Sequence, residues 1–263
     1  MDLKLTNKVA VVTGGAHGIG AATVAMLRDE GCTTFALDLA SEDASKPGAQ
    51  SSNHRIVDVT NIDQIASAWR SIEETAGPIE ILVHAAAVGS RHFGFPYTNV
   101  PLEAWDNVLK VNILGMTNVA HVAGPAMAAR RNGAMVFLAS VAGQMGSQTD
   151  PPYSASKAAN INFAQCMAKD LAPHGVRVNT VCPGMVRTTL NESVWQSWNE
   201  QQPESKKLTY NDWAAEKISK VIPLGRWQKV EDVASMIVFL CSPRASEITG
   251  QTINVDGGCV MHW

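Results

Sequence analysis

Three residues of the chain have the types and the spacing to move a proton, namely Ser140, Tyr153 and Lys157. Tyr153 and Lys157 are four positions apart, so in a helix their side chains would lie one turn apart on the same face. A neighbouring ammonium group favours the phenolate and lowers the pKa of a tyrosine from its usual value of about 10. The pair is also compatible with an ordinary solvent-exposed helix face, so the prediction of an acid/base site depends on the rest of the chain.

Ser140 directly follows the apolar run at positions 135–139, which is typical of a buried strand. It would therefore stand at the carboxyl end of that strand. Ligands bind at this edge of open α/β sheets. The position of Ser140 thus favours a catalytic interpretation of the nearby Tyr153 and Lys157.

A glycine-rich turn lies near the start of the chain, between a predicted strand at 9–13 and a predicted helix that begins at Gly18. Glycines at 14, 18 and 20 let the backbone turn tightly and approach a pyrophosphate, whose charge a helix N-terminus favours. Asp38 ends the next predicted strand. A carboxylate there can accept both ribose hydroxyls of the adenosine half of NAD and would repel the 2′-phosphate of NADP.

Two further polar residues fit this interpretation. Asp58 follows the third predicted strand and is placed to meet the adenine, although an exposed turn aspartate is nearly as compatible with the sequence. Asn112 lies inside a predicted helix between Val111 and Ile113, which indicates a partly buried turn. A buried asparagine needs hydrogen-bond partners, so Asn112 is a candidate for a functional role.

The order of predicted elements indicates the fold. Apolar, β-branched runs predict strands at 9–13, 33–37, 54–57, 79–83, 135–139, 176–181 and 251–255. Helical patterns occupy about 18–30, 63–76, 101–131, 152–172 and 230–241, and the second of them has a cap at Thr60 to Asp63. This alternation predicts an α/β protein with a Rossmann-type, doubly wound parallel sheet and helices on both faces. No linker is evident, so we expect a single domain over 1–263.

The segment 184–222 breaks this alternation. It is polar, has no strand pattern and contains three tryptophans, Trp195, Trp198 and Trp213. An insertion of this length in a compact domain is usually a binding loop or a lid. We therefore expect a substrate lid after the sixth strand, with a static insertion for subunit contacts as the alternative.

The composition restricts the classes of function. The net charge is −3 without a basic block, and the first apolar run is too short for a membrane span, which argues against nucleic acid and membrane partners. The five cysteines are scattered without a Cys-x-x-Cys motif, which favours a reduced, cytoplasmic protein. The seven histidines lack metal-ligand spacing, so no catalytic metal is predicted.

Taken together, the motifs resemble the short-chain dehydrogenase/reductase family over almost the whole chain. The matching positions are Thr13, Gly14, Gly18, Gly20, Asn112, Ser140, Tyr153, Lys157, Pro183, Gly184 and the ending 249–258. The resemblance implies a usually tetrameric Rossmann-type enzyme that uses NAD or NADP without a metal, and Asp38 selects NAD. It also assigns the cofactor to Gly14, His17, Gly18, Ile19, Gly20, Asp38, Leu39, Asp58, Val59, Ala85, Ala86, Tyr153, Lys157, Pro183, Gly184, Val186 and Thr188.

The same resemblance implies roles for four catalytic residues. Tyr153 would be the general base in oxidation and the general acid in reduction, while Lys157 would lower its pKa and hold the nicotinamide ribose. Ser140 would hydrogen-bond the substrate oxygen. Asn112 would hold a water that links Lys157 to solvent.

One motif departs from the family pattern. The family usually has Asn-Asn-Ala-Gly after strand four, and this chain has His84-Ala-Ala-Ala87. Backbone contacts at Ala85 and Ala86 would survive this change, whereas the side-chain hydrogen bonds of the first asparagine and the tight turn at glycine would be lost. We interpret His84 as a structural histidine.

The substrate is the least constrained part of the prediction. Candidates to line its pocket are His92, Gln144, Met185, Trp195 and Trp198, and the insertion and the ending 257–263 are similar to relatives that act on polyols, sugars or acetoin-like alcohols. Alternatives are a steroid, cyclic-alcohol or 3-oxoacyl reductase, or a dehydration or epimerisation on the same fold. A non-catalytic nucleotide-binding regulator or structural subunit would have little reason to keep all four catalytic residues.

Overall fold

The computed structural model describes residues 2–39, 53–147 and 149–261. Its centre is a parallel sheet of seven strands in the order β3-β2-β1-β4-β5-β6-β7. The strands are β1 Val9–Thr13, β2 Thr33–Asp38, β3 His54–Ile56, β4 Ile79–His84, β5 Gly133–Leu138, β6 Val176–Pro183 and β7 Thr252–Val255. The strand order reverses direction between β1 and β4, which is the place where open sheets of this kind bind ligands. The predicted doubly wound α/β fold is confirmed.

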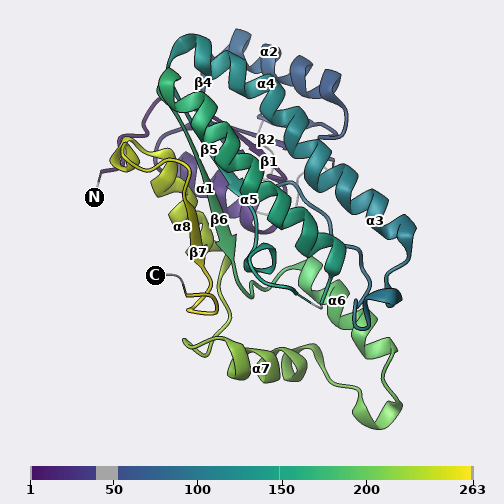
Figure 1. The fold of residues 1–263 in the computed structure, drawn as a ribbon. Coiled ribbons are helices and arrows are strands. Elements are labelled where there is room, and N and C mark those ends of the chain that lie inside the picture. Colours follow the sequence, from purple (N-terminus) through teal and green to yellow (C-terminus); the bar gives the residue numbers. More distant parts are fainter. Residues whose placement is uncertain (1, 40–52, 148, 262–263) are drawn as a thin grey trace.

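Helices cover both faces of the sheet (Figure 1). Their bounds are α1 Gly18–Asp29, α2 Ile62–Ala76, α3 Leu102–Leu109, α4 Gly115–Arg130, α5 Pro151–Leu171, α6 Thr189–Glu200, α7 Tyr210–Val221 and α8 Val230–Cys241. One core layer packs the sheet against α2, α4 and α5, and the other packs it against α1 and α8. Within the part of the chain that the structure describes, no helix is both long and apolar enough to span a bilayer.

The side chains of β1 show how one short strand serves both layers. Val9 and Val11 belong to the core under α2, α4 and α5, while Ala10 and Val12 belong to the core under α1 and α8. Successive side chains of a strand point to opposite faces, so a strand buried on both faces must be apolar throughout. The continuous run Val9–Thr13 is therefore the sequence signature of a central parallel strand.

Two predicted helices differ from the structure in detail. The long helix at 101–131 divides into α3, a π-helical turn at Lys110–Leu114, and α4. The π turn contains Asn112, and turns of this kind often occur at functional sites. The cap of α2 is Asn61 rather than Thr60, because the Asn61 side chain accepts from the backbone N–H groups of Asp63 and Gln64. The polar stretch from Ser41 to Asn53, which the sequence predicts to be a loop or a short helix, lies outside the described residues except for Asn53.

The insertion after β6 forms α6 and α7, which lie beyond the carboxyl ends of the strands (Figure 1). The insertion has its own small core, in which Val194, Trp213 and Ala214 are buried. Side chains packed against this core include Phe93, Trp195, Trp198, Leu208, Tyr210 and Trp227. We call this group the aromatic cluster. Its residues join α6 to α7, so the two helices form one packed unit over the edge of the sheet.

Candidate active site

A cavity of about 830 Å³ opens at the carboxyl edge of the sheet. Its walls come from the loops after β1, β2, β3, β4, β5 and β6, together with α6 and α7. All seventeen predicted cofactor residues line it, from Gly14 to Thr188. The cavity therefore brings together segments that are far apart in the sequence, and its volume is typical of sites for small molecules and cofactors.

The turn after β1 fits close approach by a phosphate group. Gly14 has a φ of +68°, and a side chain there would meet the backbone nitrogen of Ala86 at 2.6 Å. The N-cap of α1, His17, makes no side-chain capping bond, and the first turn of α1 contains no acidic residue. The exposed N–H groups of a helix N-terminus attract anions. The turn and the helix thus have the properties that the pyrophosphate of a dinucleotide requires.

Asp38 stands at the end of β2, where it lines the cavity. Its Oδ2 accepts the backbone N–H of Ala16 at 3.0 Å, which fixes the carboxylate beside the glycine-rich turn. A negative charge at this place disfavours a second anionic group nearby. The residues present therefore fit an adenosine half without a 2′-phosphate.

The carboxylate of Asp150 sets the start of α5. It caps the helix by accepting the N–H of Tyr153 at 3.3 Å, and Pro151 and Pro152 occupy the first helical turn, where a missing N–H costs nothing. Its other oxygen accepts the N–H of Ser90 at 2.8 Å. Asp150 thereby ties the loop after β4 to the helix that presents Tyr153.

Lys157 follows one turn later on α5 and is 2% exposed. Its Nζ lies 5.4 Å from the centroid of the Tyr153 ring and donates to the carbonyl oxygen of Leu138 at 2.7 Å. Burial lowers the pKa of Lys157 from 10.5 to about 8. A buried ammonium group is thus held against the tyrosine by the end of β5, as the spacing of the two residues predicts.

Ser140 and Tyr153 face each other across the cavity wall. Burial and the charge of Asp150 raise the pKa of Tyr153 above its ordinary value. A hydrogen bond with the Ser140 side chain lowers this pKa by a smaller amount, so the net direction is upward. The expected lowering of this pKa by Lys157 is therefore not found. The physical reason is that the interior disfavours the phenolate more strongly than the serine hydrogen bond favours it.

Asn112 lies behind the cavity rather than in its wall. The side chain is fully buried; its Oδ1 accepts the N–H of Val88, and its Nδ2 donates to the Val88 carbonyl and to Ser156 Oγ. These bonds tie the loop after β4 to the helix that carries Tyr153 and Lys157. The side chain is thus engaged by protein groups and is not part of the cavity wall.

His84, which stands where the family usually has asparagine, is a buried residue at the end of β4. Its Nδ1 pairs with Thr13 Oγ1 at 2.8 Å, and the imidazole is 1% exposed. Burial and the charge of Lys157 lower the pKa of His84 to about 3, so the ring is neutral near pH 7. The backbone N–H of Ala85 donates to the Thr13 carbonyl at 3.0 Å. His84 thus braces the ends of β1 and β4, in agreement with its interpretation as a structural histidine.

The predicted substrate residues divide into two groups. Met185 lines the cavity, whereas His92, Gln144, Trp195 and Trp198 do not. Gln144 exchanges two hydrogen bonds with Asn254 at the end of the sheet. Both tryptophans pack into the aromatic cluster, so the expectation that one of them faces the pocket is wrong for this structure. The aromatic side chains of the insertion thus supply much of its own core.

The structure adds residues that the sequence reasoning missed. On the side of the cavity formed by the loop after β5 and by the insertion, they include Met145, Ser147, Thr149, Asp150, Leu190, Asn191, Val194, Lys217, Val221 and Cys259. The Asp-Pro-Pro sequence before Tyr153 is a helix-start signal that could have identified Asp150. Lys217 lies between Trp213 and Val221 at intervals of four residues, which places a lysine on the inner face of α7.

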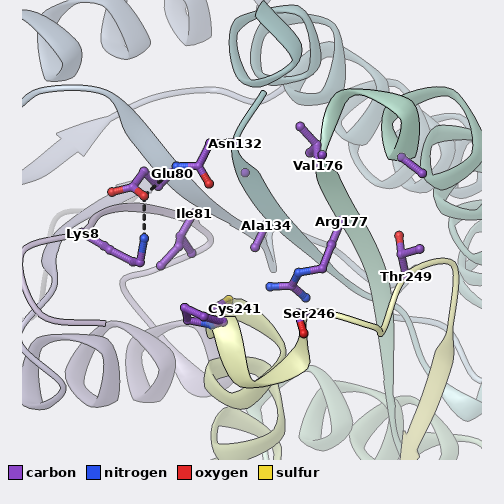
Figure 2. Close-up of a pocket in the computed structure, with 14 residues that line it drawn as sticks. Lys8, Glu80, Ile81, Asn132, Ala134, Val176, Arg177, Cys241, Ser246 and Thr249 are labelled. Atoms are coloured by element: carbon purple, nitrogen blue, oxygen red, sulfur yellow. Dashed lines mark hydrogen bonds and ion pairs between the residues drawn. The ribbon is translucent and has the colours of Figure 1, made fainter. Parts of the chain in front are cut away.

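A second cavity, of about 330 Å³, lies at the opposite edge of the sheet (Figure 2). Its charged groups have partners within the fold: Lys8 pairs with Glu80 at 2.5 Å, and Asn132 donates to Glu80 at 2.8 Å. Arg177 donates to the carbonyls of Leu240 and Ser242 at the end of α8. This edge therefore consists of structural contacts. Across the described residues, no group of three or more His, Cys, Asp or Glu side chains has a metal-binding arrangement.

Comparisons with known proteins agree with this geometry. A family model described as enoyl-(acyl carrier protein) reductase matches residues 14–260. A 3-oxoacyl-(acyl-carrier-protein) reductase from Thermotoga maritima is 34% identical over 98% of this chain and 100% of its own length. An NAD-dependent glycerol dehydrogenase from Listeria innocua is 32% identical over 98% of this chain and 95% of its own.

A solved structure is similar over nearly the same range. The aldohexose dehydrogenase of Thermoplasma acidophilum, in ligand-free form, has a TM-score of 0.82 and 31% identity. The match covers 97% of this chain and 94% of that one. The likeness thus extends over the sheet, the cavity and the insertion.

Proposed function

The chain belongs to the short-chain dehydrogenase/reductase family, and from this premise we propose that it transfers a hydride between NAD(H) and a secondary alcohol or ketone. One observation carries the proposal: Ser140, Tyr153 and the buried Lys157 line the same cavity as the glycine-rich turn. When bound, the nicotinamide supplies the hydride chemistry. The chain supplies the proton, the orientation of the substrate and the exclusion of water.

In this proposal the Tyr153 hydroxyl gives a proton to the substrate oxygen in reduction and takes it back in oxidation. Ser140 donates to the same oxygen and stabilises the charge that develops on it. The ammonium of Lys157, 5.4 Å from the centroid of the Tyr153 ring, would hold the nicotinamide ribose. Asn112 acts as a positioning residue, because its contacts with Val88 and Ser156 fix the loop and the helix around these groups.

We propose NAD rather than NADP as the cofactor. The support is the Asp38 carboxylate beside the glycine-rich turn, where the 2′-phosphate of NADP would meet a like charge. The printed name of the Listeria relative, an NAD-dependent enzyme, is consistent with this choice. We also propose a cytoplasmic homotetramer, as is usual for the family, and the five free cysteines fit a reducing compartment.

We propose that the segment 184–222 acts as a lid over the bound substrate. Leu190 and Val194 of α6 and Val221 of α7 line the cavity, so a movement of the insertion would open or cover it. The aromatic cluster would make α6 and α7 move together. Closure of such a lid excludes water from the reacting groups.

The names of the relatives suggest two substrate classes, namely polyols or sugars and 3-oxoacyl esters. The mixture of polar side chains such as Ser147 and Asn191 with apolar ones such as Met145 is compatible with both. A non-catalytic regulator remains the alternative from another class. The assay below separates these possibilities.

The experiment is a panel of polyols, sugars, acetoin, cyclic alcohols, steroids and 3-oxoacyl esters, monitored by NADH and NADPH absorbance. The proposal predicts turnover of at least one class, with a higher kcat/KM for the NAD(H) pair. Lid closure predicts slower proteolysis within 190–220 when NADH and a substrate analogue are both present. Binding of NADH without turnover of any class would favour the regulator.

A further inference from the structure

Lys217 projects from α7 into the wall of the active-site cavity. Its ammonium nitrogen lies 4.1 Å from the centroid of the Trp213 ring, in the aromatic cluster. Among the described residues, no carboxylate forms an ion pair with it. Burial lowers the pKa of Lys217 to about 8, so the fold holds this cation where its charge is poorly solvated.

The neighbouring lysine of the same helix shows the usual arrangement. Lys220 lies on the exposed side of α7 and pairs with Glu216 at 2.6 Å, one turn earlier. Lys217 has no such partner on the described part of the chain, and its ammonium lies over an indole ring instead. A cation–π contact compensates part of the lost hydration but does not neutralise the charge. The cavity side of α7 thus retains a net positive charge.

The acidic groups of the cavity do not offset this charge. Asp38 ends β2 and Asp58 follows β3, at one side of the sheet. In contrast, α7 ends near the turn after β7, at the other side of the sheet. The backbone N–H of Leu224, just beyond α7, donates to the carbonyl of Gly257 at 3.1 Å. Asp150 is engaged by the N–H groups of Ser90 and Tyr153.

A second cation strengthens the positive field on the insertion side. Arg187 also lines the cavity, with its guanidinium carbon 5.7 Å from the centroid of the Tyr210 ring and a contact to Asn211 at 3.5 Å. It has no carboxylate partner among the described residues. Two cations, Lys217 and Arg187, therefore line the cavity and face aromatic rings of the insertion.

We propose that the substrate carries an anionic group, a carboxylate or a phosphate ester, and that Lys217 binds it. The inference rests on the proposed function and narrows it to charged hydroxy or keto compounds. The anion would bind at α7 while the reacting oxygen meets Ser140 and Tyr153. Lys217 would then select anionic substrates, and its contribution to substrate affinity would be absent for neutral analogues.

The test measures the binding of ketones to the protein, with and without NAD+. No ketone can be reduced in either mixture, because neither contains NADH. Two pairs isolate the charge: acetoacetate against methyl acetoacetate, and dihydroxyacetone phosphate against dihydroxyacetone. Calorimetry or the fluorescence of Trp213 and its neighbours reports binding. The variants are Lys217→Gln and Lys217→Met, and methionine keeps an unbranched apolar side chain next to Trp213. Lys220→Gln is the control on the same helix.

We expect the anionic member of at least one pair to bind roughly 10- to 100-fold more tightly, as for a charge-assisted hydrogen bond. This preference disappears in both Lys217 variants and persists in Lys220→Gln, while the affinity for NAD+ is unchanged. The pair that shows it distinguishes carboxylate from phosphate. The proposal is overturned if neither pair shows a preference for the anion, or if that preference persists in both Lys217 variants. Because binding requires no turnover, failure of hydride transfer alone leaves this result interpretable.

Discussion

The two edges of the sheet hold their charged residues in opposite ways. At the amino edge, where the strands begin, Lys8 and Glu80 form an ion pair and Arg177 donates to a carbonyl at the end of α8 (Figure 2). At the carboxyl edge, Lys157 rests against a backbone carbonyl and Lys217 against an indole ring, and neither has a carboxylate partner among the described residues. In our proposal, Lys157 and Lys217 are available to a ligand, whereas the ion pair of Lys8 and Glu80 serves the fold.

This difference separates stability from function. A polar group paired within the protein contributes to folding, while a buried cation without a counterion costs folding free energy and is typical of a functional site. The cavity at the amino edge thus carries no function in our account, although its residues are also charged. Substitutions at the two edges should therefore affect different measurements.

The largest effect is expected for Tyr153→Phe at the carboxyl edge. The variant lacks the hydroxyl that transfers the proton, so kcat should fall by roughly 10²- to 10⁴-fold. The melting temperature and the affinity for NADH should change little, because the ring is retained. Turnover near that of the unmodified protein would mean that the proton comes from another group.

The next effect concerns the choice of cofactor. Asp38→Ala removes the carboxylate that faces the site of a 2′-phosphate, so the ratio of kcat/KM for NAD over NADP should fall by at least about tenfold, which corresponds to about 1.4 kcal/mol. The measurement is steady-state kinetics with both cofactors. A protein that already prefers NADP before the substitution would contradict the role of Asp38.

At the amino edge, Glu80→Gln should affect stability alone. The substitution removes the charge that Lys8 and Asn132 share, in a pair that is mostly shielded from solvent, so unfolding should require about 0.5–1 kcal/mol less. Chemical denaturation measures this difference. The kcat/KM of the variant should stay within about twofold of the unmodified enzyme, and a larger loss of activity would contradict the separation of the two edges.

The last expected effect has the opposite sign and depends on pH. The pKa of Lys217 in the fold, about 8, is below its usual value of 10.5, so between these values the unfolded chain binds more protons and stability rises with pH. Lys217→Met should thus be more stable than the parent at pH 7, and this advantage should shrink between pH 8 and 10. Denaturation curves at the two ends of that range test the sign.

The sequence allowed the cofactor half of the site to be predicted because its signals are local. The glycines after β1, the acid that ends β2 and the Tyr153/Lys157 pair each lie within one strand–turn–helix unit, and parallel strands bring their carboxyl ends to one edge. All of the predicted cofactor residues accordingly line the cavity. The alternation of strands and helices likewise predicted the order of the elements.

The substrate half could not be predicted in the same way. Whether Trp195 faces a pocket or Tyr210 depends on how α6 packs on α7, and the two aromatic rings lie 5.6 Å apart in the insertion's own core. The role of Asn112 depends on a π-helical turn that has no clear sequence signal. The pKa of Tyr153 depends on burial, which spacing along the chain does not reveal.

The most direct test of the central claim is transfer of deuterium to a ketone from NADH that carries deuterium at both C4 positions of the nicotinamide. The protein, the labelled cofactor and the ketone panel are incubated together, and the alcohol products are analysed by mass spectrometry. Our account predicts one deuterium at the carbinol carbon of at least one product, and none above background with Tyr153→Phe. The account is contradicted if no product carries deuterium with either labelled NADH or labelled NADPH. It is also contradicted if the Tyr153→Phe variant labels the product as much as the unmodified protein does.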